Sequence, residues 1–363
     1  WRLILLMFLC VFVVGLFLCL FLLIPGDTDV KIDAGAEADA GSIRDSNIQD
    51  SDKHDDNRVN DKIQNDSANS DGIKIWKEDG VRLSSVSSIE ADLDCIDLAI
   101  AVSDDDDFHL SYELHCMNRR NPLSYNVENG VLKLTETDFK ASFITGVFWD
   151  KGYIATNDCN FITLYVPSNV VLKSCIMNIT DSDLTIRELN CNTIEIKAAD
   201  SDISLSDVNI SDSMKINTED GDISMAGLYA SGAVEIITDD GDITISDFIE
   251  SGGAYIQAHY GDICLSSATA EGKMQIGTED GDVVLTELGV PGQVEIDSDY
   301  GDITVRLQKE SLSELKIVMD TEEGDISVSR SLGGKKSSGH YEREGSDTVY
   351  LKGYTEEGDI SIQ

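Results

Sequence analysis

Hydrophobic residues recur at fixed intervals along the second half of the chain. The repeat is marked by a Gly-Asp dipeptide followed by Ile or Val, which occurs every twenty residues at Gly221, Gly241, Gly261, Gly281 and Gly301. Counted from the glycine, apolar residues stand at plus two and plus four, and again seven and five residues before it. Each pair predicts one face of a short strand, because successive strand side chains point to opposite sides.

The link after each strand also carries an apolar residue, at plus seven from the glycine. In successive copies this residue is Leu228, Phe248, Ala268 and Leu288. We therefore expect three short sides around one core in every coil. Degenerate copies of the dipeptide precede the regular array at Ser182 and Ser201, and further copies follow it at Gly324 and Gly358. A fixed period in this range indicates a repeat architecture.

These features predict an all-β fold, a right-handed parallel β-helix or solenoid of 20-residue coils over residues 167–363. A hairpin meander is the alternative, because Asp and Gly between alternating apolar residues favour a two-residue hairpin turn. The constant period and the inward residue at plus seven favour the solenoid, since they stack equivalent positions coil on coil. Residues 73–166 show shorter runs with a period of two and predict a strand-rich leading section that ends before Pro167.

The N-terminal segment has a different character. Residues 3–24 carry no charge and are rich in Leu, Phe and Val, and about 20 such residues span a bilayer. We expect residues 1–25 to form a single transmembrane helix, with a cleaved signal peptide and a lipoprotein anchor at Cys19 as the alternatives. Arg2 precedes the run and Asp27 follows it. The positive-inside tendency therefore places the body outside the cell membrane, as a single-pass protein.

Acidic residues dominate the charge of the chain. Residues 26–72 are dense in Asp, Asn and Ser and predict a disordered acidic stalk, because so few apolar side chains cannot offset the entropy lost on ordering. The whole chain has a formal net charge of −41. Such a field repels phosphate backbones, which argues against nucleic acid as a partner.

A family resemblance rests on three features. The run Ile-Thr-Leu-Tyr-Val-Pro at residues 162–167 precedes a series of Thr-Glu-Asp-Gly-Asp-Ile corners, and residues 125–134 contain Val127, Gly130, Leu132 and Leu134. In these features residues 85–363 resemble the "putative adhesin" β-strand-repeat family of bacterial envelope proteins, a domain of unknown function. The resemblance implies a repeat architecture and names no ligand. Some relatives are associated with envelope-stress responses, which implies a second functional interpretation.

The repeated corner is the one constellation that could hold an ion. Stacked coils would bring five corner aspartates into one column, namely Asp222, Asp242, Asp262, Asp282 and Asp302. Like charges about 4.8 Å apart repel by roughly 0.9 kcal/mol per pair even at the dielectric of water, and calcium accepts carboxylate oxygens flexibly. A calcium ladder is therefore one hypothesis. A structural turn role is favoured, because Gly plus Asp is ordinary turn chemistry and the nonapeptide period of calcium-binding β-rolls is missing. No other cofactor is expected.

Nothing in the sequence indicates a catalytic centre. An active site is a local exception to a scaffold, whereas these acids recur on nearly every coil, so a carbohydrate-active β-helix enzyme is the weaker alternative. His259, which with Tyr260 replaces the usual acidic pair, is the one irregularity in the array and is interpreted as surface variation. Six cysteines follow residue 25, at Cys95, Cys116, Cys159, Cys175, Cys191 and Cys264. Cys175 and Cys191 fall at inward positions, where a free thiol acts as a small apolar group.

The sequence therefore predicts a membrane-anchored, non-catalytic cell-surface module with adhesin-like binding or display. Its partners would be the membrane, through the N-terminal helix, and an unidentified protein, glycan or cell-wall ligand. The alternative is an envelope-stress sensor or regulator that acts through the membrane helix.

Overall fold

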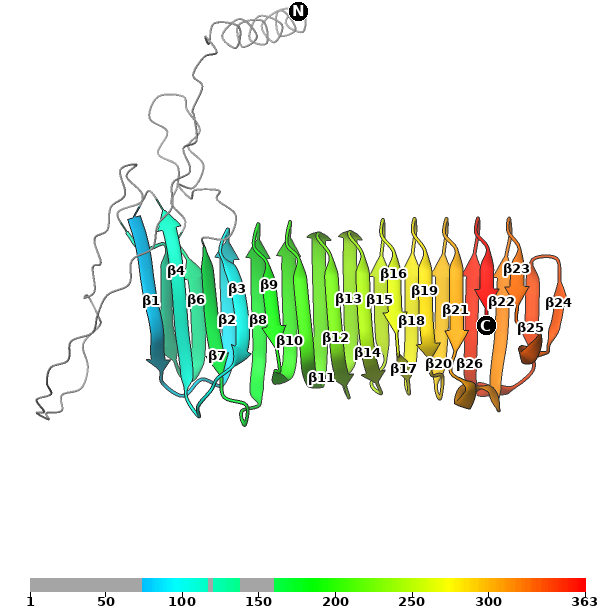
Figure 1. Ribbon diagram of the computed structural model, residues 1–363, viewed down its shortest axis with the longest axis horizontal. Helices are drawn as coiled ribbons and strands as arrows, with labels where there is room; N and C mark the ends of the chain where they lie inside the picture. Colours follow the sequence, from blue (N-terminus) through cyan, green and yellow to red (C-terminus); the bar gives the residue numbers. More distant parts are fainter. Residues whose placement is uncertain (1–73, 117–119, 138–159) are drawn as a thin grey trace, which may run out of the picture. The chain divides into compact units, whose positions relative to one another are not determined.

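A computed structural model describes residues 74–116, 120–137 and 160–363 (Figure 1). The predicted transmembrane helix (1–25) and acidic stalk (26–72) lie outside these residues. Within the described ranges, no helix is long and apolar enough to cross a membrane. The regular structure there consists of strands and two short 3₁₀ turns, η1 (Lys309–Leu312) and η2 (Arg330–Leu332), which confirms the all-β prediction.

The strands pair in two rows, and each regular coil contributes one strand to each row (Figure 1). The first row is parallel throughout and runs in the spatial order β6 (Val131–Glu136), β2 (Ser88–Asp94), β8 (Leu172–Thr180), β10 (Asn190–Ala199), the second half of β11 (Ile203–Asp220), β13 (Ala233–Asp240), β15 (Ala254–Ala258), β18 (Lys273–Thr278), β20 (Gln293–Ser298), β26 (Ser346–Thr355) and β22 (Leu315–Thr321).

The second row has antiparallel pairs only at its first three strands. Its spatial order is β1 (Lys74–Leu83), β4 (Phe108–Cys116), β7 (Phe161–Val166), β3 (Asp97–Val102), β9 (Leu184–Arg187), the first half of β11, β12 (Ile223–Ala230), β14 (Ile243–Glu250), β16 (Ile263–Ser266), β19 (Val283–Leu288), β21 (Ile303–Leu307), β27 (Ile360–Ile362) and β23 (Ile326–Val328). Short strands complete the coils and the ends: β17 (Thr269–Ala270) beside β14, β5 (Leu123–Glu128) beside β6, and the hairpin of β24 (Lys335–Ser337) and β25 (His340–Arg343) beside β22.

Equivalent residues of successive coils lie opposite one another and form the core. In the second row the plus-two residues pair in series and are fully buried: Ile223, Ile243, Ile263, Val283 and Ile303. In the first row the residues five before the glycine do the same: Ile216, Ile236, Ile256, Ile276 and Ile296. Each such side chain contributes about 1.5–3 kcal/mol by leaving water. The predicted parallel solenoid and its inward positions are confirmed, and the right-handed winding stays a prediction.

The third side expected for each coil is wrong for the coils of β12, β14 and β19, whereas Ala268 lies in a link between β16 and β17. β12 and β14 continue without a break through plus seven, so Leu228 and Phe248 belong to the second row and are buried there. The cause is one residue at plus six in the left-handed region, Gly227 with φ 69° and Asp247 with φ 52°. This extra residue shifts the alternation by one position, as in a β-bulge, and turns plus seven inward without ending the strand.

Both ends of the stack contain an inserted coil. β26 lies between β20 and β22, and β27 lies between β21 and β23. After β21 the chain therefore forms the outer strands β22 and β23 first. It then returns and forms β26 and β27, which lie between these outer strands and the preceding coil. At the other end β2 lies between β6 and β8, and β3 lies between β7 and β9. The described parts of the leading section and of the repeat region thus form one continuous stack.

One carboxyl group is buried in this stack. Glu250, at the end of β14, has no exposed surface. Its Oε2 accepts the backbone N–H of Gly253 at 2.7 Å, while its Oε1 has no hydrogen-bond partner among the described residues. Desolvation, followed by the charge of Glu271, raises the pKa of Glu250 above its ordinary value and outweighs the backbone hydrogen bonds that lower it.

This burial makes stability depend on pH. A carboxyl whose folded pKa is raised holds its proton better in the folded state, so stability falls as pH rises above about 4.5 and through the folded pKa. Glu250→Gln should therefore raise the melting temperature at pH 7.5 and lose this advantage near pH 4. Thermal melts across that range check it, with the exposed Glu128→Gln as the control for a change of one charge. Equal pH profiles for the two variants would contradict it.

Candidate functional site

The aspartates of the Gly-Asp corners form one column along the stack. The structure brings all five predicted residues together, and the backbone N–H of each donates to Oδ1 of the aspartate one coil before it, at 2.8–2.9 Å. We call this set the aspartate ladder. The same bond extends the ladder to Asp97, Asp183 and Asp202 at one end and to Asp359 and Asp325 at the other. Since each bond has a charged acceptor, the corner aspartates stabilise the register of the coils.

The glycine of the corner is required by the closeness of the coils. A Cβ added to Gly281 would lie 2.2 Å from the carbonyl oxygen of Gly261, and one added to Gly241 would lie 2.3 Å from that of Gly221. No side chain fits such a gap. The corner is also tied from within, because the buried Thr278 hydroxyl donates to the Gly261 carbonyl at 3.1 Å. The Gly-Asp repeat is thus explained by backbone packing and hydrogen bonding.

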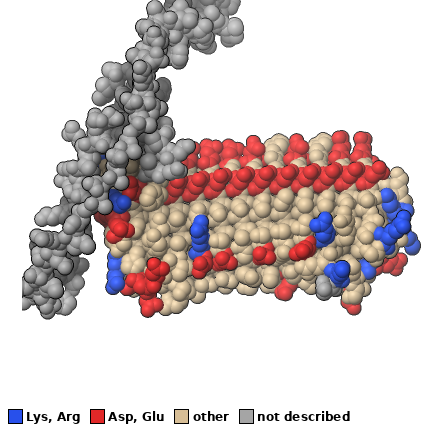
Figure 2. Space-filling model, viewed as in Figure 1, with Lys and Arg blue, Asp and Glu red and all other residues tan. Residues whose placement is uncertain are grey.

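Further acids stand beside the ladder and form an acidic edge, which Figure 2 shows as rows of Asp and Glu along the stack. The carboxyl groups of Asp200 and Asp220 share a hydrogen bond, and this bond raises the pKa of Asp220. His259 Nδ1 lies 2.7 Å from Asp239 Oδ1, and its Nε2 lies 3.9 Å from Glu279 Oε1. The histidine thus lies between two coils of acids as an ordinary surface partner, in line with its interpretation as surface variation.

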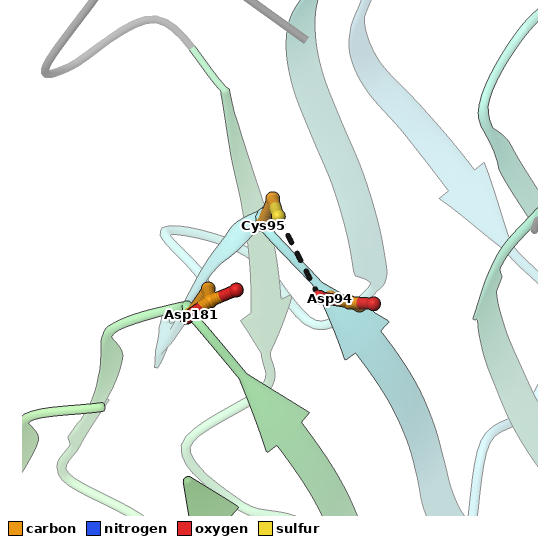
Figure 3. A group of neighbouring side chains, drawn as sticks. All are labelled: Asp94, Cys95 and Asp181. Atoms are coloured by element: carbon orange, nitrogen blue, oxygen red, sulfur yellow. Dashed lines mark hydrogen bonds between the residues drawn. The ribbon is translucent and has the colours of Figure 1, made fainter. Parts of the chain in front are cut away.

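Within the described residues, one group has three potential metal-binding atoms close together, and it isn't part of the predicted column. Asp94, Cys95 and Asp181 bring theirs within 4.8 Å of one another. Figure 3 shows that they come from two neighbouring corner turns, β2–β3 and β8–β9. The Cys95 thiol donates to Asp94 Oδ1 at 3.5 Å. A structural zinc site needs four ligands, and this group supplies three. Its residues belong to the corner turns. The calcium ladder stays a prediction.

Cys175, Cys191 and Cys264 are free thiols. Cys175 and Cys191 are fully buried, as predicted from their inward register, and their Sγ atoms lie 3.7 Å apart. Cys159 lies outside the described residues. Packing therefore accounts for this buried pair.

A hollow of about 620 Å³ opens on the outer face of the first row. Its floor is formed by β15, β18, β20, β26 and β22, and its volume lies in the range of ligand pockets. One outward column runs through Gln257, Gly277, Asp297 and Tyr354. At Gly277 the column has no side chain, and an added Cβ would meet nothing closer than the Asp297 carbonyl oxygen at 3.7 Å. The missing side chain makes the hollow.

The walls of the hollow combine aromatic and acidic groups. Tyr255, 40% exposed, stands at one side. On the other side the Tyr354 hydroxyl donates to Glu322 at 3.0 Å, and desolvation together with this carboxylate raises the pKa of Tyr354 to about 12. Asp297 makes no side-chain hydrogen bond or ion pair within the described part of the chain. Desolvation, and then the charge of Asp299, raise its pKa.

Sequence reasoning missed this hollow. The signal that could have shown it is Gly277 itself, which stands four residues before the corner glycine where the neighbouring coils carry Gln257 and Asp297. A glycine inside a strand often marks a place where something else approaches the backbone. Tyr354 belongs to the inserted coil, so its place beside Asp297 could not be derived from a simple count of twenty.

A second, shallower groove of about 430 Å³ lies on the other side of the coils. Its apolar lining includes Val171, Tyr229 and Ile249, which are 59%, 47% and 39% exposed. Its polar lining consists of neutral Asn and Ser side chains, whereas the hollow also has charged groups to orient a ligand, so the hollow is the better candidate site.

Two glycines of the same coil should respond oppositely to a methyl group. Gly281→Ala places a Cβ against the Gly261 carbonyl and should reduce the free energy of unfolding by about 3 kcal/mol or more. Gly277→Ala has room for its Cβ and should leave stability within about 0.5 kcal/mol of the unsubstituted chain. Urea unfolding measures both. A tolerated Gly281→Ala would show that the coils are further apart at this corner.

Ions should affect stability through the aspartate ladder. Folding concentrates negative charge, so sodium chloride should raise the melting temperature by screening, whose length is about 8 Å near physiological ionic strength. If the corners bind calcium, the melting temperature in millimolar calcium should be higher than in magnesium or sodium salts at matched ionic strength. Asp242→Asn with Asp262→Asn should then reduce the excess, because Asn keeps the Oδ1 acceptor and removes the charge. Equal shifts in all three salts would indicate screening alone.

Solved structures of bacterial proteins are similar over most of this chain. One from Bacteroides fragilis, described as a "putative adhesin", is 12% identical with a TM-score of 0.36, and the match covers 81% of this chain and 98% of that one. One from Clostridium sporogenes, described as a "putative cell adhesion protein", is 9% identical with a TM-score of 0.26, covering 80% and 98%. One from Parabacteroides distasonis, described as a "putative lipid binding protein", is 15% identical with a TM-score of 0.32, covering 81% and 98%. No curated protein matches the chain.

The family is shown by the sequence of the repeat region together with its leading section. The model of the family described as Toastrack DUF4097 matches residues 86–363, which begins two residues before β2 and includes every later strand of both rows. This range agrees with the resemblance that the corners and the Val-Pro strand carry in the sequence. The chain belongs to the Toastrack DUF4097 family.

Proposed function

We propose that this chain is a non-catalytic cell-surface module with adhesin-like binding, held at the membrane by residues 1–25 with its body outside. The observation that carries the proposal is the hollow over Gly277, where aromatic and carboxylate side chains meet on strands that are fixed in the stack. A rigid sheet face needs little ordering when a partner binds, so more of the contact energy remains as affinity.

A binding role accounts for the acids better than catalysis does. The carboxylates of the aspartate ladder accept backbone hydrogen bonds on coil after coil, which is a scaffold role. A hydrolase would need one carboxyl pair set apart from such a scaffold by its environment. A high negative charge also suits a displayed protein, because it keeps the surface soluble and repels anionic lipid headgroups.

The proposal is tested on cells that produce the full-length chain. They should be retained on at least one surface from a panel of immobilised glycans, cell-wall fragments and extracellular proteins, and protease added to intact cells should digest the body. Deleting residues 1–25 should remove the chain from the membrane pellet. Cells without the chain are the control.

The rival function predicts a different pattern. An envelope-stress regulator should change the transcription of envelope genes when it is deleted, without any effect on retention. That result, together with no retention on any surface of the panel, would contradict the binding proposal.

A further inference from the structure

We propose that the hollow over Gly277 binds a basic segment of a partner protein, which lies across the coils with Lys or Arg side chains among its carboxylates. This inference rests on the proposed surface-binding function and adds the chemistry of the ligand. It follows from the charges that the fold leaves unpaired, from the aromatic walls and from the length of the hollow.

Three of the acids that line the hollow contact a lysine or a histidine. Glu295 lies 2.8 Å from Lys273, and this contact, followed by the Tyr350 hydroxyl, lowers the pKa of Glu295. Asp320 lies 2.6 Å from His340. Asp297 and Asp299 are different, since neither carboxylate has an ion pair within the described part of the chain. These two adjacent, unpaired charges are what a cationic ligand would neutralise.

The lining offers little positive charge of its own. Among the described residues that line the hollow, Lys352 is the only one with a basic side chain, and its ammonium group lies 4.6 Å from the centre of the Tyr350 ring. Against it stand Glu279, Glu295, Asp297, Asp299 and Asp320. An anionic ligand is therefore disfavoured, and a cation is attracted by the site as well as by the net charge of −41 on the whole chain.

The tyrosines provide a second attraction for cations. A Lys ammonium or an Arg guanidinium is held over the face of an aromatic ring by its quadrupole, and an exposed ring is available in Tyr255. Tyr255 and Tyr354 lie on strands that are three steps apart in the first row, β15 and β26. The two rings therefore stand on either side of the gap at Gly277 and can contact different side chains of one segment.

The dimensions favour a segment over a metal ion or a small amine. The described residues hold one group with three metal-ligand atoms within 4.8 Å, and it lies at the β2–β3 corner, away from the hollow. The five strands of the floor extend over roughly 19 Å, at about 4.8 Å per strand. An extended chain covers that length with about six residues. Such a segment crosses the coil of Asp297 and Asp299, where basic side chains on its two edges can reach these carboxylates.

The experiment measures binding of a labelled seven-residue lysine-rich peptide to the full-length protein in nanodiscs at 150 mM salt, by fluorescence anisotropy. An acidic peptide of the same length and a neutral oligosaccharide are the comparison probes. Asp297→Asn with Asp299→Asn should weaken peptide binding about tenfold or more, equivalent to one decade in Kd. Gly277→Gln should also weaken it, because it restores the side chain that Gln257 has in the preceding coil and fills the hollow.

The matched control is Asp207→Asn with Asp247→Asn, which removes the same charge from the second row. It should change Kd less than about twofold, because at this salt exposed charges beyond about 8 Å are screened. Unchanged melting temperatures show that each variant is folded. Equal losses from both double variants would overturn the inference in favour of diffuse charge. Binding of the oligosaccharide instead of the peptide would also overturn the inference but would leave the surface-binding function intact. Failure of cells that produce the chain to be retained on any surface of the panel would instead contradict that function.

Discussion

Neighbouring coils meet at the glycine corners, where backbone lies against backbone more closely than any Cβ permits. An added Cβ would come within 2.2 Å of a carbonyl oxygen at Gly281, so no side chain fits there, whereas the first coils carry Ser182 and Ser201 at the equivalent position. This closeness brings the N–H of each corner aspartate to the Oδ1 of the one before it. With the corners in register, equivalent strands pair in parallel, and the inward isoleucines of both rows stack into one core. Because these contacts join adjacent coils, stability belongs to the array more than to any single repeat.

The inserted coils resolve a difficulty that any such array has at its ends. A terminal coil presents an open core and unpaired strand edges, which invite aggregation. Here β26 and β27 return beneath β22 and β23, and the β24–β25 hairpin pairs beside β22. The outermost short strand, β24, has two lysines on an exposed edge, Lys335 and Lys336, a charge pattern that opposes edge-to-edge pairing. The C-terminal strands β26 and β27 therefore lie in the interior of the stack.

Departures from the repeat are the places where the surface acquires individual chemistry. Gly277 omits one outward side chain and opens the hollow, and the inserted coil brings Tyr354 next to Asp297. The acids of the corners, in contrast, recur and are explained by the ladder. A regular scaffold thus accounts for the corner acids, and two irregularities, Gly277 and the inserted coil of β26, account for the candidate binding site.

The period of twenty by itself determined the strand faces and the inward residues, because side chains alternate along a strand. It favoured the parallel stack over a hairpin meander, because a constant repeat places Ile243 and its equivalents coil on coil. It also placed Asp222, Asp242, Asp262, Asp282 and Asp302 in one column. The period did not predict the left-handed residue at plus six, such as Asp247. This residue lets one strand continue where two separate sides of the coil were expected. Nor did the period predict the spatial order of the terminal coils, since β26 pairs with β20 across an intervening excursion of the chain. Only the tertiary structure decided that the corner carboxylates accept hydrogen bonds from backbone N–H groups, and that a hollow lies between Tyr255 and Tyr354. Both features depend on contacts between coils, which the spacing of residues in the sequence does not specify.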